Sequence, residues 1–243
     1  MKNLIAIMIY SCLSFSAYAG TGFEISKSDI AILKNNQSIS ELGCDSFESV
    51  NVDTLKGKAI SIPDDIYGGK KVLDKSSISC SLFSYSDEGN KVLVYITEKD
   101  DIDGIKITIP HSGFAAEIDG GRDGGGWQLT CNIDKMDDSK TCYLLQKNLF
   151  IFRNPSNYSV YIGAKQLSGS ISKLRVDKGN VYEAIGDASF KQSKEIAAEM
   201  LSGKTVLIRY TRLDDHMIVD EDIDLASFKV ALDILDRAYF HLQ

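Results

Sequence analysis

The stretch Trp127-Gln-Leu-Thr-Cys131 decides how this chain folds. Apolar and polar residues alternate along it, so its first, third and fifth side chains fall on one face of an expected strand. A polar turn over Asp134–Lys140 follows, and Thr141–Leu145 then returns as a second strand that carries Cys142. A disulfide across this hairpin would fix its register, because a slip of one residue turns every side chain to the other face.

Stretches typical of strands lie on both sides of this hairpin, and helical patterns are few. The last helix carries an apolar stripe that we expect to cover a sheet, although such a stripe can also bind a partner helix. The pattern predicts a mainly β, α+β fold. The expected strands are Lys58–Ile62, Ser77–Ser84, Lys91–Thr97, Ile105–Ile109, Leu149–Phe152, Ser159–Ile162, Leu174–Val176, Asn180–Ala184 and Val206–Tyr210. The expected helices are Ser28–Lys34, one capped by Ser193 and ended by Gly203, and one capped by Asp224 after an acidic loop.

A glycine-rich run, Asp119–Gly126, holds five glycines in eight residues. Such a run is either a flexible junction or a loop that needs unusual backbone dihedrals, and we place a domain boundary there. The sequence therefore predicts a smaller β-rich domain over residues 20–125. A β-sandwich-like domain with two packed helices is predicted over residues 126–243.

The first nineteen residues have the pattern of an export signal. Lys2 precedes the short apolar run Leu4–Leu13, and Ala17-Tyr-Ala19 is a small-x-small cleavage site. The run is too short to span a bilayer, so we expect residues 1–19 to be removed and no membrane insertion afterwards. The small-x-small site suggests a bacterial exporter, and the expected location is the periplasm or the exterior.

Cysteine usage agrees with export into an oxidising compartment. Four cysteines remain after the signal, and they allow three pairings. Cys44–Cys80 and Cys131–Cys142 are favoured because each pair is near in sequence and lies on expected neighbouring strands. A redox or metal site is disfavoured, since the sequence has neither a Cys-x-x-Cys pair nor a histidine cluster.

The formal net charge of −7 bears on partners. Binding to a phosphate backbone or to an anionic membrane surface needs clustered Lys and Arg, so nucleic acid is not an expected partner. Acidity in an exported protein is most simply a feature that favours solubility.

The segment from Gly126 onwards resembles the invasion-associated locus B family. The resemblance rests on Trp127–Cys131, the returning Thr141–Leu145, the small helix before Gly203 and the closing Asp224–Leu232, where Ser227 replaces the family's usual glycine. Members are exported bacterial proteins with a compact β-rich domain, linked to host-cell entry in some pathogens and otherwise of unknown molecular activity. The resemblance thus implies fold and compartment, and brings no catalytic residues.

Candidate chemistry is sparse. His216 follows Asp214 and Asp215, either of which could orient it as a general base, but no nucleophile motif accompanies it and a solvated loop histidine is favoured. Several runs of carboxylates could supply the oxygen ligands that calcium prefers. None of them has the Asp-x-Asp-x-Asp-Gly pattern with a later Glu that is typical of a calcium-binding loop, so we expect solvated turns rather than calcium sites. These runs are Asp100, Asp101 and Asp103; Asp119 and Asp123; Asp134, Asp137 and Asp138; and Asp214, Asp215, Asp220, Glu221 and Asp222.

The remaining candidates are aromatic. Tyr158 and Tyr161 could form part of a sugar- or peptide-binding face with Arg153, and Tyr161 is expected to point outward. We assign no catalytic residue, metal or cofactor. The sequence favours an exported interaction protein, without enzyme activity, that binds another envelope or secreted protein. The alternatives are a periplasmic inhibitor or immunity protein against a cell-wall-acting enzyme, and a hydrolase with an unrecognised site.

Overall fold

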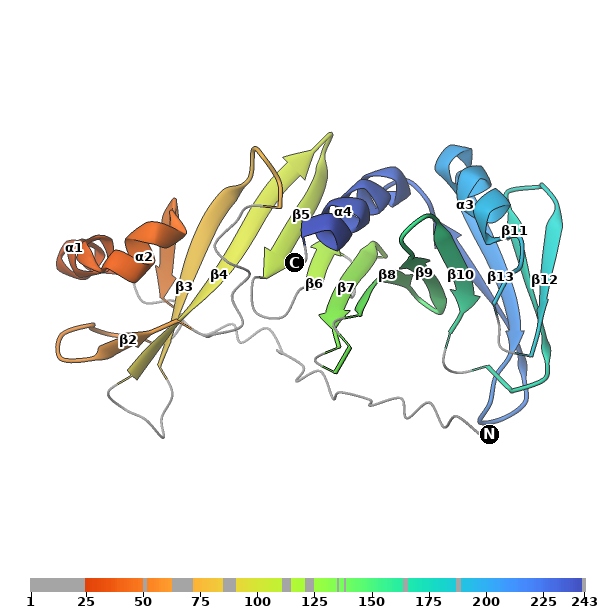
Figure 1. Cartoon of the computed structure of the whole chain (residues 1–243), viewed down its shortest axis with the longest axis horizontal. Coiled ribbons are helices and arrows are strands. Elements are labelled where there is room, and N and C mark those ends of the chain that lie inside the picture. The colour runs from red at the N-terminus through yellow and green to blue at the C-terminus, as the bar shows by residue number, and fades with distance from the viewer. Residues whose placement is uncertain are drawn as a thin grey trace.

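The computed structural model describes residues 25–49, 52–62, 72–84, 91–110, 115–120, 125–134, 136–137, 139–163, 166–186 and 189–241. These residues form two β-sheets and four helices (Figure 1). The mainly β, α+β class predicted from the sequence is confirmed. The predicted export signal lies outside the described residues.

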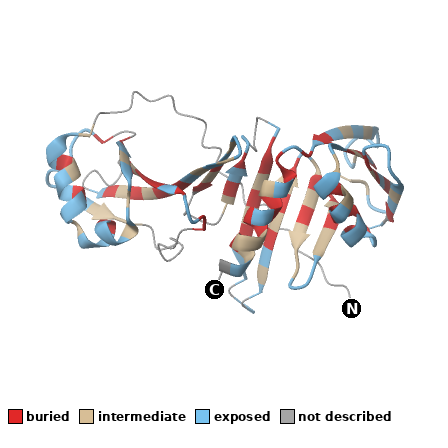
Figure 2. Cartoon of the chain, turned by 90° about the horizontal axis from the view of Figure 1, so that it is seen from above, coloured by how far each residue is buried: buried red, intermediate tan, exposed pale blue. Residues whose placement is uncertain are grey.

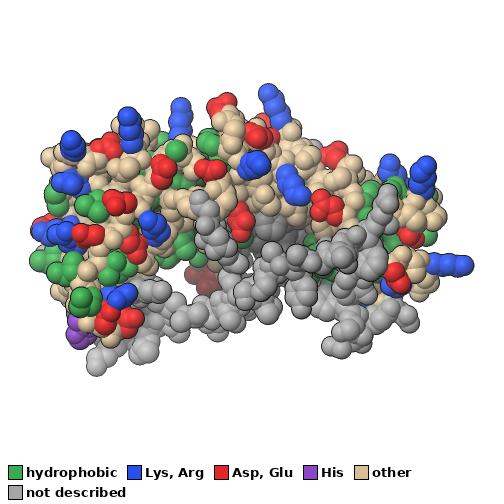
Figure 3. Space-filling view, turned by 180° about the vertical axis from the view of Figure 1, so that it is seen from behind, with side chains coloured by type: hydrophobic (Ala, Val, Ile, Leu, Met, Phe, Trp, Pro, Cys, Tyr) green, Lys and Arg blue, Asp and Glu red, His purple; other side chains and the backbone are tan. Residues whose placement is uncertain are grey.

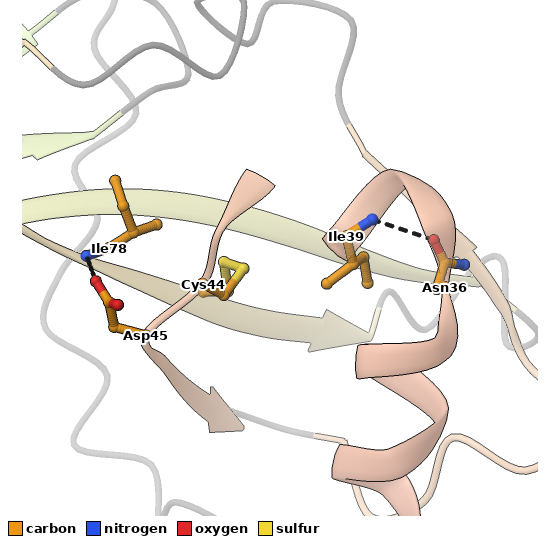
Figure 4. The surroundings of a disulfide bond; sticks show 6 residues. Asn36, Ile39, Cys44, Asp45 and Ile78 are labelled. Carbon is orange, nitrogen blue, oxygen red and sulfur yellow. Dashed lines mark hydrogen bonds between the residues drawn. A yellow bond between two sulfur atoms is a disulfide. The ribbon is translucent and has the colours of Figure 1, made fainter. Parts of the chain in front are cut away.

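The described chain begins with two short helices, α1 (Lys27–Asn35) and α2 (Gln37–Leu42). The Asn36 side chain caps α2 by accepting the Ile39 amide at 3.2 Å, as Figure 4 shows. Gly43 ends α2 at φ 65°, a left-handed conformation that glycine adopts without a Cβ penalty. The turn leads into β1 (Ser46–Ser49), which pairs in parallel with β3 (Ser77–Ser84).

The first sheet has ten strands, and its backbone pairing runs without a break from β1 to β10. The strand β4 (Lys91–Ile102) is long enough to pair with β3 over residues 92–99 and with β5 (Ile105–Pro110) over residues 97–102. The remaining strands are β2 (Ala59–Ser61, beside β4), β6 (Ala115–Ile118), β7 (Trp127–Ile133), β8 (Lys140–Gln146), β9 (Leu149–Arg153) and β10 (Tyr158–Ile162).

The second sheet has the order β12 (Val181–Ile185), β11 (Ile171–Val176), β13 (Thr205–Thr211) and β14 (Ile218–Asp224). The helix α3 (Ser193–Ser202) packs against β10 and β11, and α4 (Phe228–His241) lies across β7, β8 and β9 (Figure 1). The apolar stripe of α4 therefore covers a sheet, as the sequence favours.

Three local predictions are wrong. The acidic segment expected to be a loop is the strand β14. Asp224 ends that strand and accepts the Ala226 amide at 2.9 Å, while α4 begins four residues later. Ser193 does not cap α3; its hydroxyl oxygen accepts the Val160 amide at 2.9 Å and so ties the helix to β10.

Two hydrophobic clusters hold the fold, seen as separate groups of buried residues in Figure 2. The larger one unites both sheets with α3 and α4, around fully buried Trp127 and Phe228, whose rings lie 5.1 Å apart. The smaller one joins α1 and α2 to β3 and the first half of β4, with Leu33 and Val94 fully buried.

The change from one cluster to the other falls along β4, not at the glycine-rich run. Ala116 on β6 pairs with Leu129 on β7, so the sheet continues past the boundary predicted at residues 125–126. A Cβ atom added at Gly126 would lie 2.1 Å from the Ile118 carbonyl oxygen. This end of the run therefore packs closely against β6, a contact that only glycine permits.

The two disulfides join Cys44 to Cys80 and Cys131 to Cys142, the pairs that the sequence favours. Beside the first, Figure 4 shows the Asp45 carboxylate accepting the Ile78 amide at 2.8 Å. The second joins directly opposed residues of β7 and β8. In the part of the chain that the structure describes, no helix combines the length and apolar character needed to cross a membrane.

Candidate interaction surface

A cluster of aromatic rings lies on the side of the first sheet that faces away from α4. We call it the aromatic face and define it by Tyr143, Phe150, Phe152 and Tyr161. Its residues alternate along β8, β9 and β10 with buried core residues, so they share the opposite side of the sheet. All four side chains are half-buried.

The strand register brings these rings into contact. Tyr143 lies opposite Phe152, and Phe150 lies opposite Tyr161. The ring centroids of Tyr143 and Phe152 are 5.1 Å apart, and those of Phe152 and Tyr161 are 5.2 Å apart in an edge-to-face arrangement. Phe150 lies 5.5 Å from Tyr143 and 6.0 Å from Phe152. Such geometries are favourable for aromatic pairs and hold the four rings in fixed positions.

The residue after β10 contributes to this arrangement. A Cβ atom added at Gly163 would lie 2.3 Å from the Phe150 ring, so the ring lies directly over the glycine backbone. The Gly163 amide also donates to the Asn148 carbonyl at 2.7 Å, which holds the end of β10 against the turn between β8 and β9. The aromatic face is therefore built by strand register and by one close backbone contact.

Arg153 and Tyr158 lie on the other side of the same strands, beneath the end of α4. The Arg153 guanidinium forms an ion pair with Asp236 at 2.5 Å and lies 5.2–5.3 Å from the ring centroids of Tyr158, Tyr239 and Phe240. The Tyr158 hydroxyl donates to Asp236 at 2.8 Å. The pKa of Tyr158 is raised to about 12, chiefly because the hydroxyl is partly buried and to a smaller extent because it donates this hydrogen bond. Both residues thus anchor α4 to the sheet.

The structure separates the three residues that the sequence predicts as one binding face. Tyr161 belongs to the aromatic face and is half-buried, whereas Arg153 and Tyr158 face α4. Sequence reasoning missed Tyr143, Phe150 and Phe152. All four residues of Leu149–Phe152 are apolar, so a strand there has apolar side chains on both of its faces. That pattern could have indicated that aromatic rings lie on the side of the sheet away from the core.

A second polar cluster connects the two sheets. Asn148, in the turn between β8 and β9, donates through its side-chain amide to Glu221 at 3.0 Å and to the Tyr210 hydroxyl at 2.5 Å. Tyr210 in turn donates to Glu221 at 2.9 Å. The pKa of Tyr210 is raised to about 12, chiefly because the hydroxyl is partly buried and to a smaller extent because it donates to Glu221. This cluster positions β13 and β14 against the first sheet.

His216, Asp214 and Asp215 lie in the turn between β13 and β14, whereas other candidate carboxylates lie on strands, Asp100 and Asp101 on β4 and residues 220–222 on β14. Asp214 and Asp215 both pair with Arg212. His216 lies in the same turn at φ 58° and is exposed. Other carboxylates accept nearby backbone amides, as Asp101 does from Gly104 at 2.8 Å.

Within the described ranges, no group of three or more His, Cys, Asp or Glu side chains is arranged to hold a metal ion. Asp123 and Asp138 lie outside those ranges.

Comparison of this chain with models of known protein families, with curated proteins and with solved structures finds no match. The resemblance to the invasion-associated locus B family therefore stays a prediction.

Proposed function

We propose that this chain is an exported protein that binds another protein of the envelope or the exterior through its aromatic face. One observation carries the proposal: four rings in mutual contact stay half-buried on the sheet side away from α3 and α4. Aromatic residues are enriched among the residues that contribute most to binding at protein interfaces.

The physical argument rests on rigidity and chemistry. The rings stand on three hydrogen-bonded strands, so little conformational entropy remains to be lost when a partner covers them. Tyr143 and Tyr161 add hydroxyl groups beside the two phenylalanine rings, and a partner can meet these with hydrogen bonds while it buries the carbon surface.

The compartment is part of the proposal. Two disulfides are typical of proteins that fold where thiols are oxidised, which agrees with the predicted export signal. The partner is then a protein that meets this chain outside the cytoplasm.

Site-specific photo-crosslinking in the producing bacterium tests the proposal. Benzoylphenylalanine replaces Phe152 on the aromatic face, or Lys229 on the exposed side of α4 as a matched control. We expect one discrete adduct from position 152 and none from position 229, and we expect Tyr161→Ser to abolish that adduct. Equal adducts from both positions, or none from position 152, would contradict the proposal.

A further inference from the structure

The strand β12 forms an open edge of the four-stranded sheet. Figure 1 shows it at the end of the molecule, and among the described strands it pairs with β11 alone. The outer strands β10 and β14 are each contacted by another part of the chain: the Phe190 amide donates to the Val160 carbonyl of β10 at 3.0 Å, and the Lys147 ammonium donates to the Asp222 carbonyl of β14. No such contact reaches the backbone of β12 from the described residues, so its outward N–H and C=O groups are available for pairing.

The sequence of β12 does little to prevent such pairing. Edge strands are usually kept apart by charged side chains, especially lysine, or by proline. The strand Val181-Tyr-Glu-Ala-Ile185 has neither a lysine nor a proline, and its one charge, on Glu183, is neutralised by Lys173 of β11 at 2.8 Å. Val181 is 53% exposed. The edge is therefore apolar and almost uncharged.

Beside this edge lies a cation without a counter-charge. Arg175 of β11 stands on the outward side of the sheet, between Val181 of β12 and Leu207 of β13. Its Nε atom is buried without a hydrogen-bond acceptor, and no carboxylate of the described residues pairs with it. The other outward cations of β11 and β13 are paired, Lys173 with Glu183 and Arg209 with Asp220. Figure 3 shows charged side chains of both signs interspersed with hydrophobic ones at this end of the molecule.

A second copy of this chain can supply the missing acid. When two β12 strands pair antiparallel with Tyr182 opposite Tyr182, Glu183 of each copy lies opposite Val181 of the other. Glu183 then shares a cross-strand row with Arg175 of the other copy, at two strand spacings, or about 10 Å between backbones. Extended arginine and glutamate side chains together span this distance, and the arginine stem can cover Val181. The exchange is reciprocal, so a two-fold dimer makes it twice.

Charge also selects this register. Moving the pairing along by one step that keeps the same faces together places Glu183 opposite Glu183, and like charges directly opposed are destabilising. With Tyr182 on the two-fold axis, the two tyrosine rings instead form a cross-strand aromatic pair. We propose that β12 is a dimerisation edge, through which two copies of this chain join their four-stranded sheets into one continuous antiparallel sheet.

The dimerisation edge and the aromatic face lie on different sheets, so each proposal can fail without the other. The edge belongs to the four-stranded sheet, whereas the aromatic face belongs to the ten-stranded sheet. Tyr161→Ser, which removes a ring of the aromatic face, should therefore leave the dimer unchanged.

Sedimentation velocity of the purified protein tests the dimer. We expect a reversible monomer–dimer equilibrium that shifts towards dimer as the protein concentration is raised. Arg175→Glu and Glu183→Lys should each weaken the dimer about tenfold or more, because each places like charges together in both rows. Arg209→Glu is the matched control, since it reverses an outward cation on β13, which β11 separates from β12, and it should leave the dimer unchanged.

A mixture of the two weakened variants separates this edge from any other dimer interface. In the mixed pair, position 175 of one copy carries glutamate and position 183 of the other carries lysine, so one row regains opposite charges while the other keeps its native ones. The mixture should dimerise although neither variant does so alone. Any of four results would overturn the proposal: a protein that stays monomeric at every soluble concentration, a dimer that neither variant weakens, a mixture that dimerises no better than its components, or a dimer that Tyr161→Ser weakens as much as Arg175→Glu.

Discussion

Glu98 lies where the two hydrophobic clusters meet along β4. Its side chain is fully buried, and its carboxylate accepts the backbone amides of Val72 at 2.9 Å and Leu73 at 2.7 Å. The Ser76 hydroxyl donates to the same carboxylate. Val72 and Leu73 belong to the larger cluster, so this one acid fixes a connecting segment against the second half of β4.

Glu98→Gln should destabilise the fold by about 2 kcal/mol or more, since an NH₂ group would then face a backbone N–H donor in a buried site. Urea unfolding followed by the fluorescence of Trp127, the only tryptophan, measures the change. The matched control is Glu117→Gln, where the side chain is exposed on β6. Equal stability of the two variants would contradict a role for the Glu98 carboxylate.

At the scale of elements, the helix α4 is held to the sheet at its end by Arg153. The guanidinium side chain is 10% exposed and has Asp236 as its carboxylate partner. On the solvent side of α4, Asp233 pairs with Arg237 at 2.9 Å in an exposed i,i+4 arrangement. The same helix thus carries a mostly buried ion pair and an exposed one.

Asp236→Asn should cost about 1–3 kcal/mol of unfolding free energy, because it leaves a largely buried guanidinium without its counter-charge. Asp233→Asn should cost no more than about 0.5 kcal/mol, as is usual for an exposed pair on a helix. Thermal or urea unfolding of the two variants measures both costs. The anchoring role of Arg153 would be refuted by similar losses in the two variants.

The strand β14 shows why one element escaped prediction from sequence. Its inward positions are Val219, Glu221 and Ile223, and an acid in the middle of an apolar alternation is typical of a loop. Glu221 is accommodated because Tyr210 and Asn148 donate to it, and both come from other elements. Strands with regular alternation, such as Ser77–Ser84, were predicted with their observed bounds.

The aromatic face was only partly predictable for a related reason. The alternation around Tyr161 correctly indicates that its ring is on the side opposite Val160. Whether Phe152 joins it or points into the core depends on which side of the sheet α4 covers, and a run of four apolar residues leaves that open. The pairing of Arg153 with Asp236 spans 83 residues, a distance that no local pattern reports.

At the scale of the whole molecule, one backbone sheet carries two separate hydrophobic clusters. The glycine-rich run suggested a boundary from composition alone, yet pairing of β6 with β7 makes the sheet continuous there. Along β4 the buried alternation through Val94 and Ile96 ends at Glu98, and residues 99–102 are exposed or intermediate. Long-range packing therefore decides where the molecule divides.

This division predicts that the two disulfides stabilise different parts of the molecule. Cys44–Cys80 closes a separation of 36 residues within the smaller cluster, and Cys131–Cys142 closes one of 11 within the larger cluster. In the chain-entropy account these loops contribute about 4 and about 3 kcal/mol.

We expect Cys44→Ala/Cys80→Ala to speed amide hydrogen exchange in α1, α2 and β3 while β7, β8 and β9 keep their protection. The reason is that the smaller cluster has few buried residues with which to replace the lost crosslink. Cys131→Ala/Cys142→Ala is the matched control and should expose the larger cluster instead. Equal loss of protection in both clusters would show that β4 couples them into one cooperative unit.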